Sequence, residues 1–139
     1  MNRLAAKQRD RVTAIDMHLI QPPNAPQLLV PHPFSGVLDG GLSQDVRING
    51  RPAATELSTA TNTPGHLPQS PGDFVRPPSN QAQIRTGSTS VRINHRGAAR
   101  AGDPAFTCND PMDLAIGTVV VPDGPDGPDG PDRPVRIGG

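Results

Sequence analysis

Three histidines and the single cysteine have the side chains of this 139-residue chain that best suit metal chemistry. They are His18, His32, His66 and Cys108, and they lie 14, 34 and 42 residues apart. None of these intervals is a zinc-finger spacing. Pro, Gly, Asn or Asp lies near each of them, which predicts that all four lie in turns between strands. Three neutral imidazoles and one thiolate would form a closed tetrahedral donor set suited to structural Zn²⁺.

Other chemistry fits the same side chains. A histidine in a loop is more often solvated than a ligand, and a lone cysteine is more often a small buried apolar residue. Cys108 with a histidine could also be the nucleophile and base of a hydrolase, although no Ser/His/Asp arrangement, phosphate-binding loop or carboxylate pair is present. Asp16, Asp103 and Asp110 stand beside turns, where backbone hydrogen bonding explains them, and Asp16 could also orient a ligating histidine. His95 is predicted to be an exposed turn residue.

The composition leaves open what stabilises the chain. It contains 18 prolines, 15 glycines and three phenylalanines, with no tryptophan or tyrosine, so an ordinary aromatic core cannot be built. A single cysteine excludes an intramolecular disulfide. The chain is therefore either a Pro/Gly-rich adaptor that folds on a partner, or a small domain stabilised by something other than apolar burial. A zinc ion, with an apparent binding free energy of about 10–16 kcal/mol, would be sufficient to stabilise such a small domain.

Charge and hydropathy argue against several classes of partner. The formal net charge is zero at pH 7, which gives no reason to expect a nucleic acid or an anionic membrane as partner. No apolar run approaches the ~18 residues of a membrane span. The first residues are not followed by the apolar segment of a signal peptide, so we expect synthesis in the cytoplasm.

Two copies of one stretch organise the chain. They are residues 43–54 and 88–99, with starting points 45 residues apart. Each contains Val-Arg-Ile, whose alternation of apolar and polar residues is typical of a half-buried strand. Asn49-Gly50 is a strong signal for a two-residue type I′ turn, and Asn94-His95 is its weaker counterpart. Both copies are therefore predicted to be β-hairpins that return through two alanines.

The remaining segments are predicted to be strands and loops, with no convincing helix. Short strands are expected at residues 11–16 and 116–121, and residues 135–137 resume the strand pattern as a faint third copy. Proline-rich stretches at 21–33 and 55–83 are expected to be extended loops, the second long enough to need a ligand fixing its middle. The predicted organisation is a lead-in, a β domain, an Asp-Gly-Pro low-complexity loop and a terminal strand, at residues 1–11, 12–121, 122–134 and 135–139.

Together these features resemble the PAAR-repeat proteins, the sharpened tips of contractile injection machines. The repeats contain Pro52-Ala53-Ala54 and Ala98-Ala99-Arg100-Ala101-Gly102-Asp103, and the resemblance runs from about residue 12 to 121. His95 and Gly97 depart from the family's Gly and Pro, and the Asp-Gly-Pro triplets look like an insertion. The other matching stretches are Asp16-Met17-His18, Pro31-His32-Pro33-Phe34, residues 62–68 and Thr107-Cys108-Asn109-Asp110-Pro111.

The resemblance implies a mainly β, small cone-shaped fold of short β-hairpins with approximate internal three-fold symmetry. One structural zinc ion per chain would hold its vertex through His18, His32, His66 and Cys108. The base would dock as a single tip on a trimeric β-helical spike. The implied function is structural and not enzymatic: the tip caps and sharpens the spike, helps to pierce the target envelope and links effector cargo to the spike.

The same resemblance implies where the protein acts. Type VI secretion systems, phage-tail-like particles and extracellular injection particles all use such tips. The protein would be made in the cytoplasm, assembled at the end of the particle and delivered to the target cell. It would contact the target membrane only transiently and would bind no nucleic acid. The Thr-Cys-Asn-Asp-Pro variety, with no toxin attached, favours a phage-tail-like particle by analogy.

Overall fold

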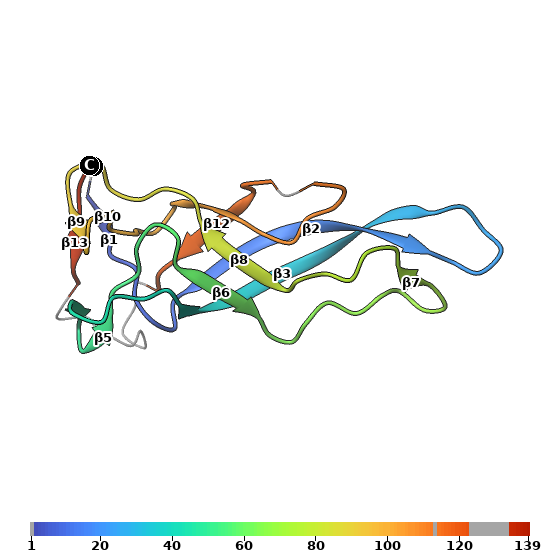
Figure 1. Ribbon diagram of the computed structural model, residues 1–139, viewed down its shortest axis with the longest axis horizontal. Helices are drawn as coiled ribbons and strands as arrows, with labels where there is room; N and C mark the ends of the chain where they lie inside the picture. The colour runs from blue at the N-terminus through green and yellow to red at the C-terminus, as the bar shows by residue number, and fades with distance from the viewer. Residues whose placement is uncertain (1, 113, 123–133) are drawn as a thin grey trace.

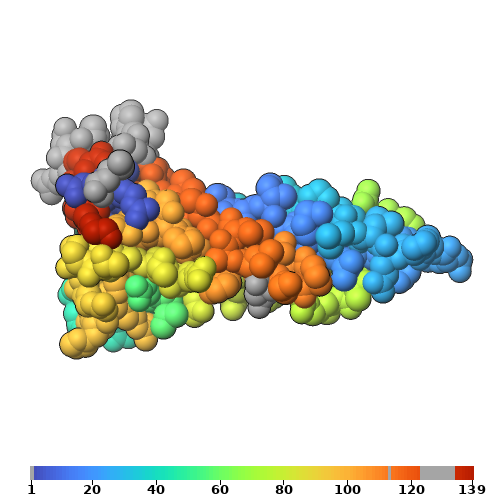
Figure 2. All heavy atoms as spheres, turned by 90° about the horizontal axis from the view of Figure 1, so that it is seen from above, coloured from blue at the N-terminus to red at the C-terminus, as the bar shows by residue number. Residues whose placement is uncertain are grey.

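The computed structural model describes residues 2–112, 114–122 and 134–139, and these residues form strands, turns and bends with no helix. The molecule is elongated and tapers from a broad base, where the C-terminus lies, to a narrow end (Figure 1, Figure 2). The narrow end is the loop between β2 (Arg11–Gln21) and β3 (Leu28–Gly40), which form one long antiparallel hairpin. A mainly β fold is therefore confirmed. The predicted Asp-Gly-Pro loop at 122–134 lies almost entirely outside the described residues.

Six of the described strands close into a small antiparallel barrel. The strand order is β2–β3–β6–β8–β11–β12, and β12 pairs back with β2. Side chains fill a barrel of this size, and here Val12, Phe34, Leu38, Ile84 and Val119 pack with several alanines. The other members are β6 (Thr59–Asn62), β8 (Gln81–Ile84), β11 (Pro104–Phe106) and β12 (Gly117–Val120), while β7 (Asp73–Phe74) pairs with the far end of β2.

The two predicted β-hairpins lie in the base. Their turns have positive φ at both central residues, as type I′ turns require: 51° and 81° at Asn49 and Gly50, and 52° and 69° at Asn94 and His95. His95 is exposed, as predicted. The strands of the two hairpins are β4 (Arg47–Ile48) with β5 (Arg51–Pro52), and β9 (Arg92–Ile93) with β10 (Arg96–Gly97).

A third small sheet corrects the prediction for the N-terminus. The predicted third copy forms β13 (Arg136–Ile137), which pairs with β1 (Arg3–Leu4). Residues 1–11, predicted to be a lead-in, therefore contribute a strand to the base, and residues 5–7 are buried there. This copy is hard to detect in the sequence because its halves lie at opposite ends of the chain. Its returning segment, Arg3-Leu4-Ala5-Ala6, corresponds to Arg51-Pro52-Ala53-Ala54 and Arg96-Gly97-Ala98-Ala99.

Backbone contacts among the three copies follow an approximate three-fold pattern. Ala6 N donates to Ala99 O at 2.9 Å, Ala99 N donates to Ala54 O at 3.0 Å, and Ala54 N donates to Ala6 O at 3.0 Å. All three alanines are fully buried, and their small side chains let the three backbone segments approach closely. The expected internal three-fold symmetry is therefore present. Three isolated bridges repeat the pattern, Ala5–Arg100, Lys7–Ala53 and Thr55–Ala98.

The long hairpin corrects the prediction of a proline-rich loop in this part of the chain, because β3 includes Pro31 and Pro33. Pro31 lies opposite Met17, whose N–H points away from β3 and donates to Asn109 Oδ1 at 2.7 Å. The N–H that each proline lacks would therefore point to the outer edge of β3. On that edge β6 pairs only from Gly36 onward. Proline is tolerated in such edge positions because no ladder hydrogen bond is lost there.

Candidate metal centre

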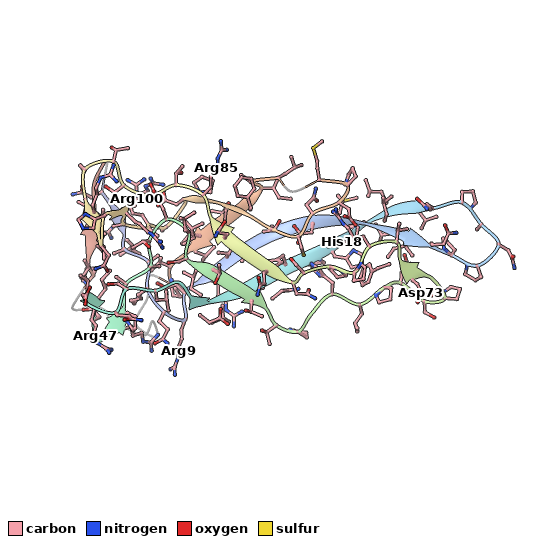
Figure 3. The ribbon with its side chains drawn as sticks, in the orientation of Figure 1. Arg9, His18, Arg47, Asp73, Arg85 and Arg100 are labelled. Carbon is pink, nitrogen blue, oxygen red and sulfur yellow. The ribbon has the colours of Figure 1, made fainter. Side chains whose placement is uncertain are left out.

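The inner face of the β2–β3 hairpin holds two of the predicted ligands. Side chains alternate between the two faces of a strand, and Asp16, His18, His32 and Phe34 are all buried on the same face. His18 and His32 thus lie within strands, which corrects the prediction that all four candidates lie in turns. Figure 3 shows His18 between the base and the loop that ends the molecule, so this residue is set back from the extreme tip.

Two other segments bring the remaining candidates to this face. His66 lies in the loop between β6 and β7, where its backbone N–H donates to Asn80 Oδ1 at 2.9 Å. Cys108 follows β11, and the neighbouring Asp110 N–H donates to Met17 O at 2.6 Å, which fixes this segment along the edge of β2. The centre is therefore assembled from three parts of the chain that are distant in sequence.

Asp16, His18, His66 and Cys108 form a buried group that could hold a metal ion, because one ligand atom from each lies within 4.8 Å of the others. Cys108 Sγ is 3.6 Å from His18 Nε2 and 3.4 Å from Asp16 Oδ2. His66 Nε2 is 3.2 Å from the same Asp16 oxygen, so Asp16 does contact a candidate ligand. Two imidazole nitrogens, one sulfur and one carboxylate oxygen are donors that Zn²⁺ accepts. Three of the four predicted ligands thus belong to the group, together with Asp16.

His32, the fourth predicted ligand, has its ring beside this group. Its ring centroid lies 5.3 Å from those of His18 and His66, which are 4.9 Å apart. His32 Nδ1 is 2.9 Å from Val30 O, and His32 Nε2 is 3.2 Å from Leu67 O. A neutral imidazole has one N–H and can donate to only one of these carbonyls. The shorter contact favours the proton on Nδ1, which leaves the lone pair of Nε2 for a cation.

Asp110, predicted only as a turn residue, orients His18. Its Oδ2 is 3.2 Å from His18 Nδ1 and accepts the Leu19 N–H at 3.4 Å, while its Oδ1 pairs with Arg76. Burial alone would raise the pKa of Asp110, but the Leu19 N–H, His18 and Arg76 together hold it below its ordinary value. A carboxylate on Nδ1 directs the other ring nitrogen to a metal. Asp110 and His18 are 92 residues apart, so no local sequence pattern connects them.

Without a bound metal, burial favours the protonated thiol of Cys108 and the neutral imidazole of His66. Burial, with a further contribution from the charge of Asp16, raises the pKa of the Cys108 thiol to about 12. Burial also lowers the pKa of His66, and the hydrogen bond to Asp16 only partly offsets this effect. A protonated thiol is a poor nucleophile. It can still bind a metal, because binding displaces the proton.

Function has to be argued from this fold and this site. Comparisons of the chain with protein-family models, curated proteins and solved structures give no significant match. Among the described residues, no helix is long and apolar enough to cross a membrane. The resemblance to the PAAR-repeat proteins therefore stays a prediction from sequence motifs.

The raised pKa of Cys108 predicts how the metal-free protein titrates. Thiolate absorbance in the ultraviolet should appear near pH 12 in the folded protein and near pH 9 in urea, with no tyrosine to obscure it. Because the folded pKa exceeds the unfolded one, the thiol's contribution to stability is complete below about pH 9 and is lost as the pH rises towards 12. Asp16→Asn should lower the folded value. Ionisation of the folded wild-type thiol at the unfolded pKa would contradict the prediction.

Proposed function

We propose that this protein is the structural tip of a contractile injection machine and caps a trimeric β-helical spike. The observation that carries the proposal is the three-fold base, which contrasts with the single hairpin at the narrow end (Figure 1). One chain with three equivalent surfaces can contact all three subunits of a symmetric trimer at once. The PAAR-like motifs support the same function. The tip would reach the target envelope first and help to pierce it, and it could link effector cargo to the spike.

The side chains of the base fit a three-fold partner. In each of the three copies, a valine that is 37–39 % exposed stands two residues before an isoleucine that is 7–8 % exposed. The isoleucines pack with three buried alanines in a small apolar cluster of their own. Exposed apolar side chains at equivalent positions could be buried against the end of a trimer. The valines are Val46, Val91 and Val135, and the isoleucines are Ile48, Ile93 and Ile137.

One structural zinc ion per chain would hold the narrow half together, bound by His18, His32, His66 and Cys108. Three imidazoles and one thiolate complete a tetrahedral site with no position left for substrate. These ligands come from the hairpin, from the loop before β7 and from the segment after β11, so the ion would crosslink all three. A metal crosslink would resist axial force better than scattered apolar contacts.

Asp16 would then act as an outer carboxylate beside the ion. It already accepts a hydrogen bond from Thr107 Oγ1 and contacts His66 Nε2, so its oxygens have partners within the protein. His32 offers a lone pair on Nε2, which at present faces the carbonyl of Leu67, a group that cannot donate to it. A cation would be a better partner for that nitrogen.

The alternatives are less well supported. A Cys/His-dependent hydrolase needs a thiol that ionises near neutral pH, whereas burial raises the pKa of Cys108 to about 12. An adaptor that folds only on a partner would not be expected to close a barrel by itself, as the described residues do. A structural role fits both observations.

The proposed ligand set predicts different zinc affinities for variants of two residues that lie opposite each other in the hairpin, His32 and Asp16. His32→Gln removes a ligand and should weaken zinc binding by more than a hundredfold, whereas Asp16→Asn removes only an outer hydrogen bond and should weaken it about 10–100-fold. Competition with a chelator of known affinity measures both. If His32→Gln retained zinc and Asp16→Asn lost it, Asp16 would replace His32 as the fourth ligand.

Docking through the base predicts one chain per spike trimer. The protein is co-expressed with a trimeric β-helical spike protein, and light scattering gives the mass of the complex. Val46→Asp combined with Val91→Asp should abolish the complex, because two of the three apolar contacts become charged. Leu28→Asp combined with Leu29→Asp is the matched control at the narrow end, where these residues are 44 % and 46 % exposed, and should leave the complex intact. Three chains per trimer, or loss of the complex only in the control, would refute docking through the base.

A further inference from the structure

We propose that the outer face of the β2–β3 hairpin is a lipid-binding surface that enters the apolar region of a bilayer. The face consists of apolar cross-strand pairs, whereas a solvent-facing antiparallel sheet ordinarily presents polar side chains. Ile15 is 59 % exposed and Leu29 is 46 % exposed, and Pro31 and Pro33 on β3 are exposed as well. A contiguous exposed apolar surface indicates an interaction site. The pairs are Ile15–Pro33, Met17–Pro31 and Leu19–Leu29.

The absence of exposed charge from the hairpin beyond the barrel favours lipid over protein as the partner. Between Val12 and Leu38 the ionisable residues are Asp16, His18 and His32, and all three are buried on the opposite face. The loop at residues 22–27 contains only Pro, Asn, Ala and Gln. Charged groups are strongly disfavoured in hydrocarbon, and a protein partner would normally be recognised in part through charge. The outer face and the loop of the hairpin are therefore uncharged, as a bilayer partner requires, and the exposed Asp73 lies on the neighbouring strand β7, opposite Gln21.

The backbone of the hairpin also suits a water-poor environment, in which each N–H needs a partner. On the outer edge of β3, Pro31 and Pro33 have no N–H, and the Ser35 N–H donates to a side-chain amide at 2.9 Å. On the outer edge of β2, the N–H groups of Met17 and Leu19 donate to side chains of the segment after β11, at 2.7 Å and 3.4 Å. The prolines thus remove donors that lipid could not satisfy.

The shape of the molecule makes this face accessible. β2, β3 and the loop between them form the narrow end, where the blue and cyan atoms lie in Figure 2. The inner face of the hairpin packs on the candidate metal centre, so only the outward positions would contact lipid. The inference rests on these outward side chains and would stand even if the base docked on a partner other than a spike.

Tryptophan fluorescence tests the inference, because the chain has no tryptophan of its own. Leu29→Trp places the reporter on the outer face, and Val91→Trp places it on the base as a control. Each protein, as purified, is mixed with neutral phosphatidylcholine vesicles whose acyl chains bear bromine, which quenches tryptophan on contact. Leu29→Trp should lose most of its emission, and Val91→Trp should keep it. The same fractional quenching in both variants, no quenching in either, or quenching of Val91→Trp alone would overturn the proposal.

Vesicle co-sedimentation of the unlabelled protein gives a second measurement. Ile15→Thr combined with Leu29→Thr removes two large apolar side chains but keeps strand propensity, and should lower vesicle binding about tenfold. Val46→Thr with Val91→Thr should bind vesicles as the wild type does. An unchanged thermal midpoint and an intact spike complex would assign the loss to lipid contact, separately from docking. Equal vesicle binding by the Ile15/Leu29 variant would refute lipid binding. So would a wild-type protein that does not bind vesicles but forms a dimer in solution that this variant abolishes.

Discussion

The narrow half of the molecule depends on ionisable side chains that are buried against one another. β2 and β3 extend beyond the barrel, and Asp16, His18 and His32 lie on the inner face of this extension. Buried ionisable groups are costly unless they have partners. His18 is paired with Asp110, and Asp16 is paired with His66. The pairing gathers nitrogen, oxygen and sulfur donors at distances that a metal ion could bridge.

The base is stabilised in a different way, by small side chains and repeated backbone geometry. A cycle of hydrogen bonds joins Ala6, Ala54 and Ala99. In each copy, a backbone N–H donates to a side chain three residues later, and two of these side chains also form buried ion pairs within their copy. Because none of these base contacts involves the group that could hold a metal ion, the two proposed functions, docking and penetration, can lie at opposite ends of the molecule. The repeated contacts are Lys7–Asp10, Thr55–Ser58 and Arg100–Asp103.

Local signals were sufficient to predict some of these features. Asn49-Gly50 and the alternation beside it predict the first hairpin, because turn and strand preferences act over a few residues. The third copy was only half visible, since β1 and β13 stand at opposite ends of the chain. The prolines on either side of His32 argue against a strand in the sequence. A strand tolerates proline only on an unpaired edge, and only the fold shows that this part of β3 has such an edge. Asp110 was missed as the partner of His18 for the same reason, since tertiary structure alone brings them together.

The most direct test of the account is the metal content of the protein purified without added metal, measured by elemental analysis beside Cys108→Ser. The account predicts one zinc ion per wild-type chain and its loss, together with thermal stability, in the variant. A folded wild-type chain without metal would contradict it, because the buried donors of the narrow half would then be sufficient without an ion.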